Sequence, residues 1–147
     1  MKYAIPEYRL SLSVIGEQSP ITFSDSAAVY NAIRGDLENQ DREHFYVYLL
    51  DRKNGIIGKH LVGIGSQSAA IVHPREVFKA AIVGCAAAII CAHNHPSGDP
   101  GPSKEDIEIT RRLQDAGQLI GIPVLDHIVI GRGRYYSFAD EGMMECK

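Results

Sequence analysis

The stretch Ile90-Cys-Ala-His93-Asn-His95-Pro-Ser-Gly-Asp-Pro-Gly-Pro-Ser103-Lys-Glu-Asp106 joins an apolar strand to a helix and contains most of the metal-binding side chains of the chain. Residues two apart in an extended chain point the same way, so His93 and His95 can reach one ion together. Ser103 is a typical N-cap residue, and it places Asp106 in the first turn of the predicted helix. This order of strand, loop and capped helix predicts a metal site at the end of a buried strand.

Asp106 occupies an unusual position for a carboxylate. Apolar residues follow it at steps of three and four, so it opens the face that the helix is expected to bury. The other members of this face are Ile109, Leu113, Ala116 and Ile120. A buried charge is costly without a partner, and a cation held by two histidines is a partner. A purely structural alternative is that Ser103 and Asp106 only form a capping box. Two histidines and one carboxylate leave an open fourth position, which is typical of catalytic zinc.

Length and composition indicate one ordinary globular domain. The 147 residues suit a single domain, residues 1–147, and the 45% hydrophobic and 22% charged content is typical of a folded protein. The first residues have no apolar core of a secretory signal, and the apolar run 80–92 is too short to cross a bilayer. An odd number of cysteines, Cys85, Cys91 and Cys146, favours free thiols. We therefore expect a cytoplasmic protein without membrane contact.

The charge distribution argues against nucleic acid as a partner. Lys and Arg number 15 against 18 Asp and Glu, which gives a net charge of −3. No run of basic residues is present, and tight binding to phosphates needs several cations on one surface. We therefore expect no tight binding to DNA or RNA.

Alternating and periodic patterns predict the other elements. Expected strands are Tyr8–Val14, Glu43–Asp51, Ile56–Ile64, Ala86–Ala92, Val124–Ile130 and Tyr135–Phe138, with a hairpin turn at Asn54-Gly55. Two further helices are expected: one capped at Ser24-Asp-Ser26 and closed by Gly35, and one that starts at Pro74 and buries Val77, Ala81 and Ile82. This interleaving predicts an α/β or α+β sandwich with a mixed sheet and helices on both sides, and a site at the carboxyl end of a central strand.

Amide hydrolysis at such a site also needs a group that takes and returns a proton. The chain has no His-Glu-x-x-His helix, so this group must come from elsewhere. Glu43 is the best candidate, because it starts a strand that is expected to pair into the same sheet. From the residues alone, four other glutamates compete with it: Glu7, Glu76, Glu105 and Glu108.

The candidate residues together resemble a known signature. Glu43, His93-x-His95-Pro96 and Ser103-x-x-Asp106 resemble the full motif of the JAMM metalloproteases, the JAB/MPN domain family. Within that family the chain is similar to RadC-type proteins over roughly residues 41–142. The similar phrases are His73-Pro-Arg-Glu-Val-Phe-Lys, Ala92-His-Asn-His-Pro-Ser-Gly-Asp-Pro and Leu125-Asp-His-Ile-Val-Ile-Gly. The chain resembles a short RadC form without an amino-terminal helix-hairpin-helix segment, so we expect no support for a DNA-repair role.

The resemblance implies a zinc peptidase or isopeptidase on a cytidine-deaminase-like, three-layer α/β/α sandwich. His93, His95 and Asp106 would be the zinc ligands and Glu43 the general base, while Ser103 would help to hold the oxyanion. The partner would be a peptide or an isopeptide-linked protein substrate. The residues name neither that substrate nor the oligomeric state.

Three other functions remain open at this point. The first is a noncatalytic protein-binding domain of the same fold, against which the intact residue set argues. The second is a DNA-repair-associated domain. The third is a nonheme iron oxygenase, because two histidines and a carboxylate also form a facial triad. Cys91 is expected to be core rather than a ligand. His127 either supports a ligand or is simply packed.

Overall fold

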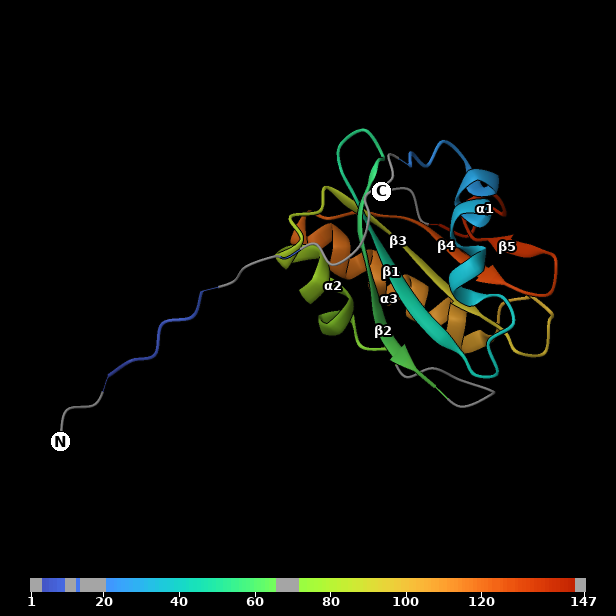
Figure 1. Ribbon diagram of the computed structural model, residues 1–147, viewed down its shortest axis with the longest axis horizontal. Helices are drawn as coiled ribbons and strands as arrows, with labels where there is room; N and C mark the ends of the chain where they lie inside the picture. The colour runs from blue at the N-terminus through green and yellow to red at the C-terminus, as the bar shows by residue number, and fades with distance from the viewer. Residues whose placement is uncertain (1–3, 10–12, 14–20, 66–71, 145–147) are drawn as a thin grey trace.

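The computed structural model describes residues 4–9, 13, 21–65 and 72–144, and these form one five-stranded sheet covered by helices on both faces (Figure 1). The strands are β1 (His44–Leu50), β2 (Ile56–Ile64), β3 (Ala88–Asn94), β4 (Val124–Ile130) and β5 (Tyr135–Ser137). The helices are α1 (Ser26–Leu37), α2 (Pro74–Val83) and α3 (Lys104–Ile120). The predicted three-layer sandwich with a mixed sheet is confirmed.

The strand order β2-β1-β3-β4-β5 puts β3 at the centre of the sheet. Strands β3 and β4 run parallel and are connected through α3, whereas the other neighbouring pairs are antiparallel. The predicted hairpin joins β1 to β2, with Asn54 in the left-handed region at φ 61° and the Asp51 carboxylate accepting from the Gly55 N–H at 2.9 Å. At the edges of the sheet, β2 shows two register shifts against β1, and β5 is only three residues long.

Alternation along the strands creates two hydrophobic cores, one on each face of the sheet. On one face, α1 packs Ile33 and Leu37 against Tyr48 and Ile90. On the other face, α2 and α3 cover a second group, which includes Phe45, Val47, Phe78, Ile89, Cys91 and Leu113. Every residue of β3 is buried, as its run without polar side chains predicted. The strand continues to Asn94, so His93 lies within β3 rather than after it.

Helix α1 continues past its predicted end at Gly35. The helix ends at Leu37, and Glu38 is its C-cap residue. Leu37 has no exposed surface. Burial of a leucine side chain contributes about 1.5–3 kcal/mol, more than the roughly 1 kcal/mol that a glycine costs inside a helix. Closure at Gly35 is therefore a wrong prediction, because tertiary burial outweighs the local preference.

Helical periodicity also misplaced two isoleucines. Ile82 is 54% exposed and Ile120 is 44% exposed, although both were expected on buried stripes. Each lies in the last turn of its helix, beyond the last residue that the helix buries, which is Ala81 in α2 and Gly117 in α3. A periodic pattern identifies the apolar face of a helix, but it does not show where that face stops touching the sheet.

Most of the strand expected at Tyr8–Val14 lies outside the described residues. Tyr8 and Arg9, which are described, are exposed and belong to no strand. Among the described residues, no helix has both the length and the apolar character that crossing a membrane would require.

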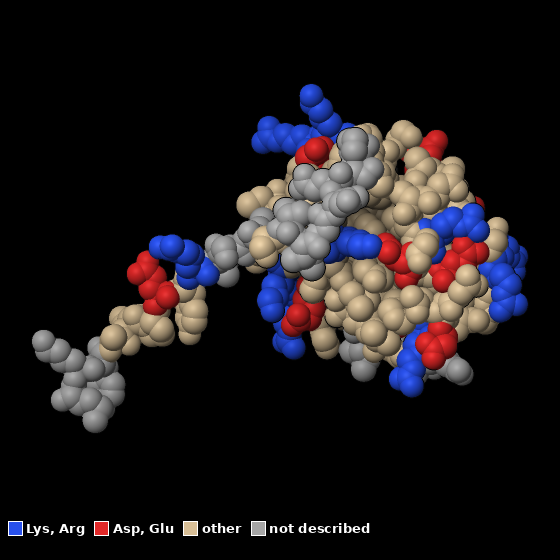
Figure 2. All heavy atoms as spheres, in the orientation of Figure 1, with Lys and Arg blue, Asp and Glu red and all other residues tan. Residues whose placement is uncertain are grey.

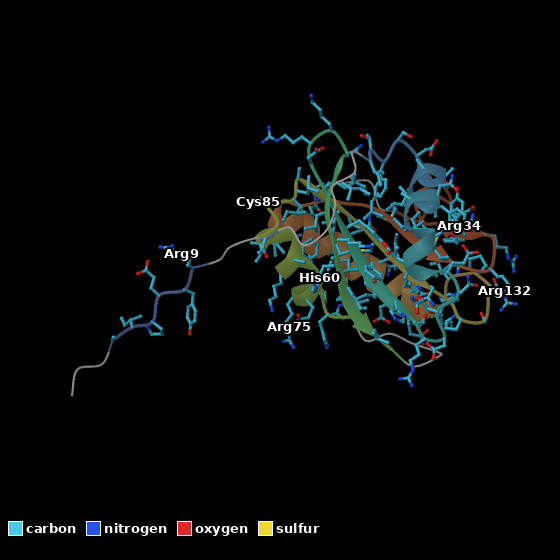
Figure 3. All side chains as sticks on the ribbon, viewed as in Figure 1. Arg9, Arg34, His60, Arg75, Cys85 and Arg132 are labelled. Carbon is cyan, nitrogen blue, oxygen red and sulfur yellow. The ribbon has the colours of Figure 1, made fainter. Side chains whose placement is uncertain are left out.

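On one face of the molecule, cationic and acidic side chains are interspersed. On the face shown in Figure 2, Lys and Arg atoms alternate with Asp and Glu atoms. Figure 3 shows Arg34 and Arg132 on the side of α1, and Arg75 near α2. Arg34 is also paired with Glu38 at 2.7 Å. This mixture of charges on the face shown matches the sequence, in which 15 Lys and Arg stand against 18 Asp and Glu.

Candidate metal centre

The candidate residues come from three segments that meet at one end of the central strand. His93 lies near the end of β3, and His95 follows that strand directly. Phe45 in β1 pairs with His93 in an antiparallel register, so Glu43, just before β1, lies beside the end of β3. Asp106 reaches the same place from the first turn of α3.

Three side chains converge closely. The Nε2 atoms of His93 and His95 are 3.1 Å apart. Asp106 Oδ1 lies 3.1 Å from His93 Nε2, and Asp106 Oδ2 lies 3.0 Å from His95 Nε2. Zinc ligands at 2.0–2.2 Å in a tetrahedral arrangement are separated by about 3.3 Å. The three groups can therefore surround one ion.

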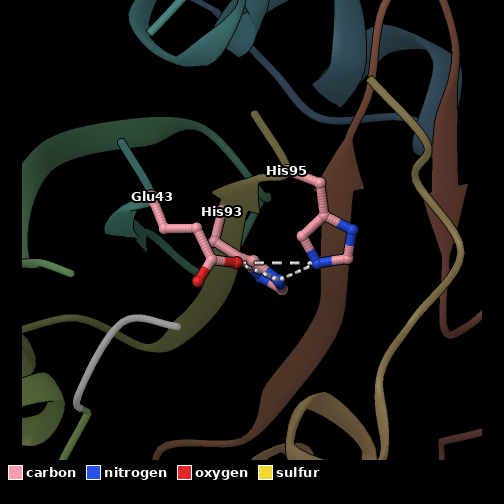
Figure 4. Close-up of side chains that lie close together, drawn as sticks. All are labelled: Glu43, His93 and His95. Atoms are coloured by element: carbon pink, nitrogen blue, oxygen red, sulfur yellow. Dashed lines mark hydrogen bonds and ion pairs between the residues drawn. The ribbon is translucent and has the colours of Figure 1, made fainter. Parts of the chain in front are cut away.

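Glu43 lies slightly further from the two rings. Its Oε1 atom is 3.9 Å from His93 Nε2 and 3.6 Å from His95 Nε2, as the dashed lines in Figure 4 mark. Glu43 is only 4% exposed. Glu43, His93 and His95 thus also form a group that could hold a metal ion, so either Asp106 or Glu43 can complete a set of three ligands.

The chemistry of His95 suits a cation at the centre. Its Nδ1 atom lies 2.8 Å from the backbone carbonyl oxygen of Asp99, which can only accept, so Nδ1 carries the proton. A neutral His95 then directs the lone pair of Nε2 toward Asp106 Oδ2 and His93 Nε2. Acceptors at these distances repel one another unless a proton or a cation lies between them. The donor set therefore fits a metal ion.

The pKa shifts of Asp106 and His95 are also consistent with a metal site. Burial by itself would raise the pKa of Asp106, but hydrogen bonds from His93 and His95 lower it well below its ordinary range. Burial would lower the pKa of His95, yet the hydrogen bonds to Asp106 and to the Asp99 carbonyl raise it above its ordinary value. Asp106 is thus a carboxylate at every physiological pH, which is the form that binds a metal.

Ser103 and Asp106 form a complete capping box at the start of α3. The Ser103 hydroxyl accepts from the Asp106 N–H at 3.1 Å, and Asp106 Oδ2 accepts from the Ser103 N–H at 2.9 Å. The capping box and the metal site are therefore not exclusive alternatives, because the Asp106 carboxylate caps the helix and also contacts both histidines. Ser103 is exposed at the rim of a hollow of about 230 Å³. The hollow is lined by Glu43, Phe45, Val72, His93, Ser103, Glu105, Asp106, Glu108, Ile109 and Arg112.

The other candidate glutamates and Cys91 have different surroundings. Glu7, Glu76, Glu105 and Glu108 are exposed, and of these only Glu105 and Glu108 line the hollow. Cys91 is fully buried in the core beneath α2 and α3. Burial raises the pKa of its thiol to about 12.

Asn94, which the sequence reasoning did not select, holds the segment that carries Glu43. Its Oδ1 atom accepts from the His44 N–H at 2.7 Å, and its Nδ2 donates to the Arg42 carbonyl at 3.0 Å. The residues on both sides of Glu43 are thereby tied to the last residue of β3, which lies between the two histidines. Its signal in the sequence is a polar side chain at the end of an apolar strand.

Two further polar residues, Thr110 and His127, lie buried behind His93. His127 has no exposed surface, and Thr110 is 2% exposed. The sequence leaves two roles open for His127, and Thr110 is not among the residues predicted for the site. A signal for Thr110 was present, because it follows Asp106 by one helical turn on the buried face of α3.

The fold and the site define a three-layer α/β/α domain with a candidate metal centre at the carboxyl end of its central strand. The chain matches the family described as the RadC-like JAB domain over residues 23–143, and it belongs to that family.

Curated relatives share much of the sequence. The chain is 45% identical over 142 residues to a UPF0758 protein of Methanosarcina mazei, which covers 97% of this chain and 62% of that protein. It is 49% identical over 134 residues to a UPF0758 protein of Caldanaerobacter subterraneus, which covers 91% of this chain and 57% of that protein. It is 51% identical over 124 residues to a UPF0758 protein of Bacillus licheniformis, which covers 84% of this chain and 54% of that protein. The chain thus spans little more than half the length of these relatives.

Proposed function

We propose that this domain is a zinc-dependent peptidase or isopeptidase. The observation that carries the proposal is the convergence of His93 Nε2, His95 Nε2 and the Asp106 carboxylate at 3.0–3.1 Å, with Glu43 just outside this set. Two imidazoles and a carboxylate suit zinc, and three protein ligands leave one position open for chemistry. Membership of the JAB family, which includes the JAMM hydrolases, supports the same conclusion.

The distances favour Asp106 as the third ligand and Glu43 as the base. Asp106 lies within ligand spacing of both rings, whereas Glu43 Oε1 is 3.6 Å and 3.9 Å from them. A bound zinc ion would lower the pKa of a coordinated water to about 7 and polarise the carbonyl of the scissile amide. Glu43 would take the proton of the attacking water and then return it to the leaving amine.

Ser103 is the residue that we propose to stabilise the carbonyl oxygen of the substrate. Its oxygen accepts from the Asp106 N–H, so the hydroxyl proton remains available for donation. A donor at the mouth of the hollow can stabilise the negative charge that develops on that oxygen. The substrate that we propose is accordingly an extended peptide or an isopeptide-linked protein.

The test compares zinc content and hydrolysis in three proteins. Wild type, reconstituted with zinc, is expected to hold about one zinc per chain and to cleave members of a peptide and isopeptide library. Glu43→Gln is expected to keep zinc and lose hydrolysis, since an amide cannot act as base. Glu108→Gln, an exposed residue of the same hollow, is the control and is expected to retain activity.

Two results would contradict the proposal. One is a wild-type protein that fails to take up zinc on reconstitution. The other is a Glu43→Gln variant that cleaves an identified substrate as fast as wild type.

A further inference from the structure

A row of hydrogen bonds leads from the ring of His93 into the core. His93 Nδ1 lies 2.7 Å from His127 Nε2. On the far side of that ring, His127 Nδ1 lies 2.6 Å from Thr110 Oγ1. The Thr110 hydroxyl in turn donates to the backbone carbonyl of Asp106 at 2.6 Å. Buried polar groups depend on partners of this kind, so each bond constrains the next.

The donor and acceptor of each hydrogen bond in this row can be assigned by starting from the Asp106 carbonyl. The Asp106 carbonyl can only accept, so the single hydroxyl proton of Thr110 lies on that bond. Thr110 Oγ1 must then accept from His127, which places a proton on His127 Nδ1. A threonine that bonds to the carbonyl four residues earlier is a common helical arrangement, so this starting point costs the helix little.

His127 is expected to be neutral in these surroundings. Its ring lies against Phe45 at 5.4 Å and Phe138 at 5.0 Å between ring centroids, and a charge there would be costly. A neutral ring with its proton on Nδ1 has a lone pair on Nε2, which can accept only from the His93 Nδ1–H.

We propose that Thr110 and His127 are positioning residues that fix the tautomer of His93, with the proton on Nδ1 and the lone pair of Nε2 directed at the metal centre. This inference rests on the metal site proposed above. In the opposite tautomer, the lone pairs of His93 Nδ1 and His127 Nε2 would face each other at 2.7 Å in a buried place. His93 would also present a proton, not a lone pair, to the ion.

The two histidine ligands thus take their tautomers from two separate backbone carbonyls. His95 is fixed directly by the Asp99 carbonyl. His93 is fixed through His127 and Thr110 by the carbonyl of Asp106, the residue whose side chain is itself at the centre. Groups that orient a metal-binding imidazole typically change metal affinity by about 10–100-fold when they are removed.

The test uses three variants along this row. Thr110→Val keeps the shape and removes the hydroxyl, and His127→Phe fills the ring volume without nitrogen. Thr110→Ser restores the hydroxyl and serves as the rescue. Long-range nitrogen–proton NMR of the metal-free proteins reads which nitrogen of His93 carries the proton. Competition with a chelator measures zinc affinity.

We expect Nδ1–H on His93 in wild type and Thr110→Ser, and a mixture of tautomers in Thr110→Val and His127→Phe. Zinc should bind about 10–100-fold more weakly to the latter two, and within about threefold of wild type to Thr110→Ser. Ser137→Ala is the matched control, because it removes a buried hydroxyl that donates to Asp126 at 2.6 Å outside this row. It should lower stability without changing the His93 tautomer or zinc affinity.

A His93 Nδ1 without a proton in the metal-free wild type would overturn the inference, whatever the variants do. Unchanged tautomer and affinity in folded Thr110→Val and His127→Phe would also overturn it. A wild-type protein that binds no zinc would refute the proposed function, and the NMR result alone would then decide the tautomer assignment.

Discussion

The Asp106 carboxylate accepts a hydrogen bond from the backbone N–H of Ser103 at 2.9 Å, through the same oxygen that lies 3.0 Å from His95 Nε2. One side chain therefore fixes the start of α3 and contacts both histidines. Removing that side chain would disturb the helix and the candidate metal centre together, whereas changing only its charge separates the two effects.

Asp106→Asn should weaken zinc binding by more than about tenfold while keeping the cap, because an amide oxygen can still accept from Ser103. Asp106→Ala should lose zinc and also about 1 kcal/mol of unfolding free energy through the lost cap. Elemental analysis after reconstitution and urea unfolding in a chelator measure the two effects. Wild-type zinc affinity in Asp106→Asn would contradict the assignment of Asp106 as a ligand.

The pairing of Asp106 with His95 should contribute most to the stability of the metal-free protein in weakly acidic solution. The lowered pKa of Asp106 gives stability that is present above its ordinary value of 3.8 and is lost as the pH falls. The raised pKa of His95 gives stability that is present below its ordinary value of 6.5 and is lost as the pH rises through the raised value. Both residues therefore contribute their full stabilisation only between about pH 3.8 and pH 6.5.

Urea midpoints over a pH series check this, in chelator and in excess zinc. Zinc needs neutral imidazoles, so zinc should move the maximum toward higher pH. His95→Ala should remove the loss of stability above pH 6.5 in chelator. His60→Ala, which removes an exposed histidine on β2 (Figure 3), should leave the profile unchanged. A profile of His95→Ala identical to that of wild type would be incompatible with the pairing.

Asn94→Ala should destabilise the protein by about 1–3 kcal/mol, since it leaves the His44 N–H and the Arg42 carbonyl without this partner. It should also lower the rate of hydrolysis, because the backbone on either side of Glu43 loses its attachment. Zinc affinity should change less than the rate. Thermal unfolding and the zinc and hydrolysis assays measure these effects, and an unchanged rate would show that Asn94 does not position Glu43.

Two glycines inside helices should respond to alanine in opposite directions. Gly35→Ala should stabilise by about 0.5–1 kcal/mol, because a Cβ there meets nothing within 4 Å. Gly117→Ala should destabilise by about 1–3 kcal/mol, because its Cβ would lie 2.5 Å from the Ile122 carbonyl oxygen. Melting temperatures measure both. Destabilisation by Gly35→Ala would instead favour a helix end at that residue.

Cysteine alkylation should distinguish Cys85 from Cys91. Cys85 is exposed at the end of α2 (Figure 3), whereas Cys91 is buried and its pKa is raised to about 12. At pH 7.5, iodoacetamide should modify Cys85 and spare Cys91, because the thiolate is the reactive form. Peptide mass spectrometry reads each site, with the urea-unfolded protein as control. Equal modification of both cysteines in the native protein would contradict the burial of Cys91.

The five strands of the sheet, and their alternation with helices along the chain, were predictable because each strand carries a clear local signal. The hairpin depends on Asn54-Gly55, and the buried character of β3 follows from its apolar run. Helix ends were less predictable, since the end of α1 depends on the burial of Leu37 by the sheet. The residues of one helix do not contain that information.

The candidate site followed from sequence where neighbouring residues carry it and failed where distant ones do. His93, His95 and Asp106 lie within one short stretch. Contact between His93 and His127 depends on the parallel register of β3 and β4, which pairs Cys91 with His127. Spacing along the chain does not reveal such a register, so the row through Thr110 became visible only in three dimensions.

Both edges of the sheet limit association with other β-sheets. An exposed edge strand offers unpaired backbone groups to any chain that can add a strand, and long regular edges therefore favour aggregation. Here β5 offers only three residues, while β2 departs twice from regular register with β1 and carries the exposed Lys59. Strand irregularity and a charged side chain are common protections of this kind. The irregular register of β2 and its charged side chain thus disfavour edge-to-edge pairing of this sheet with another copy of the domain.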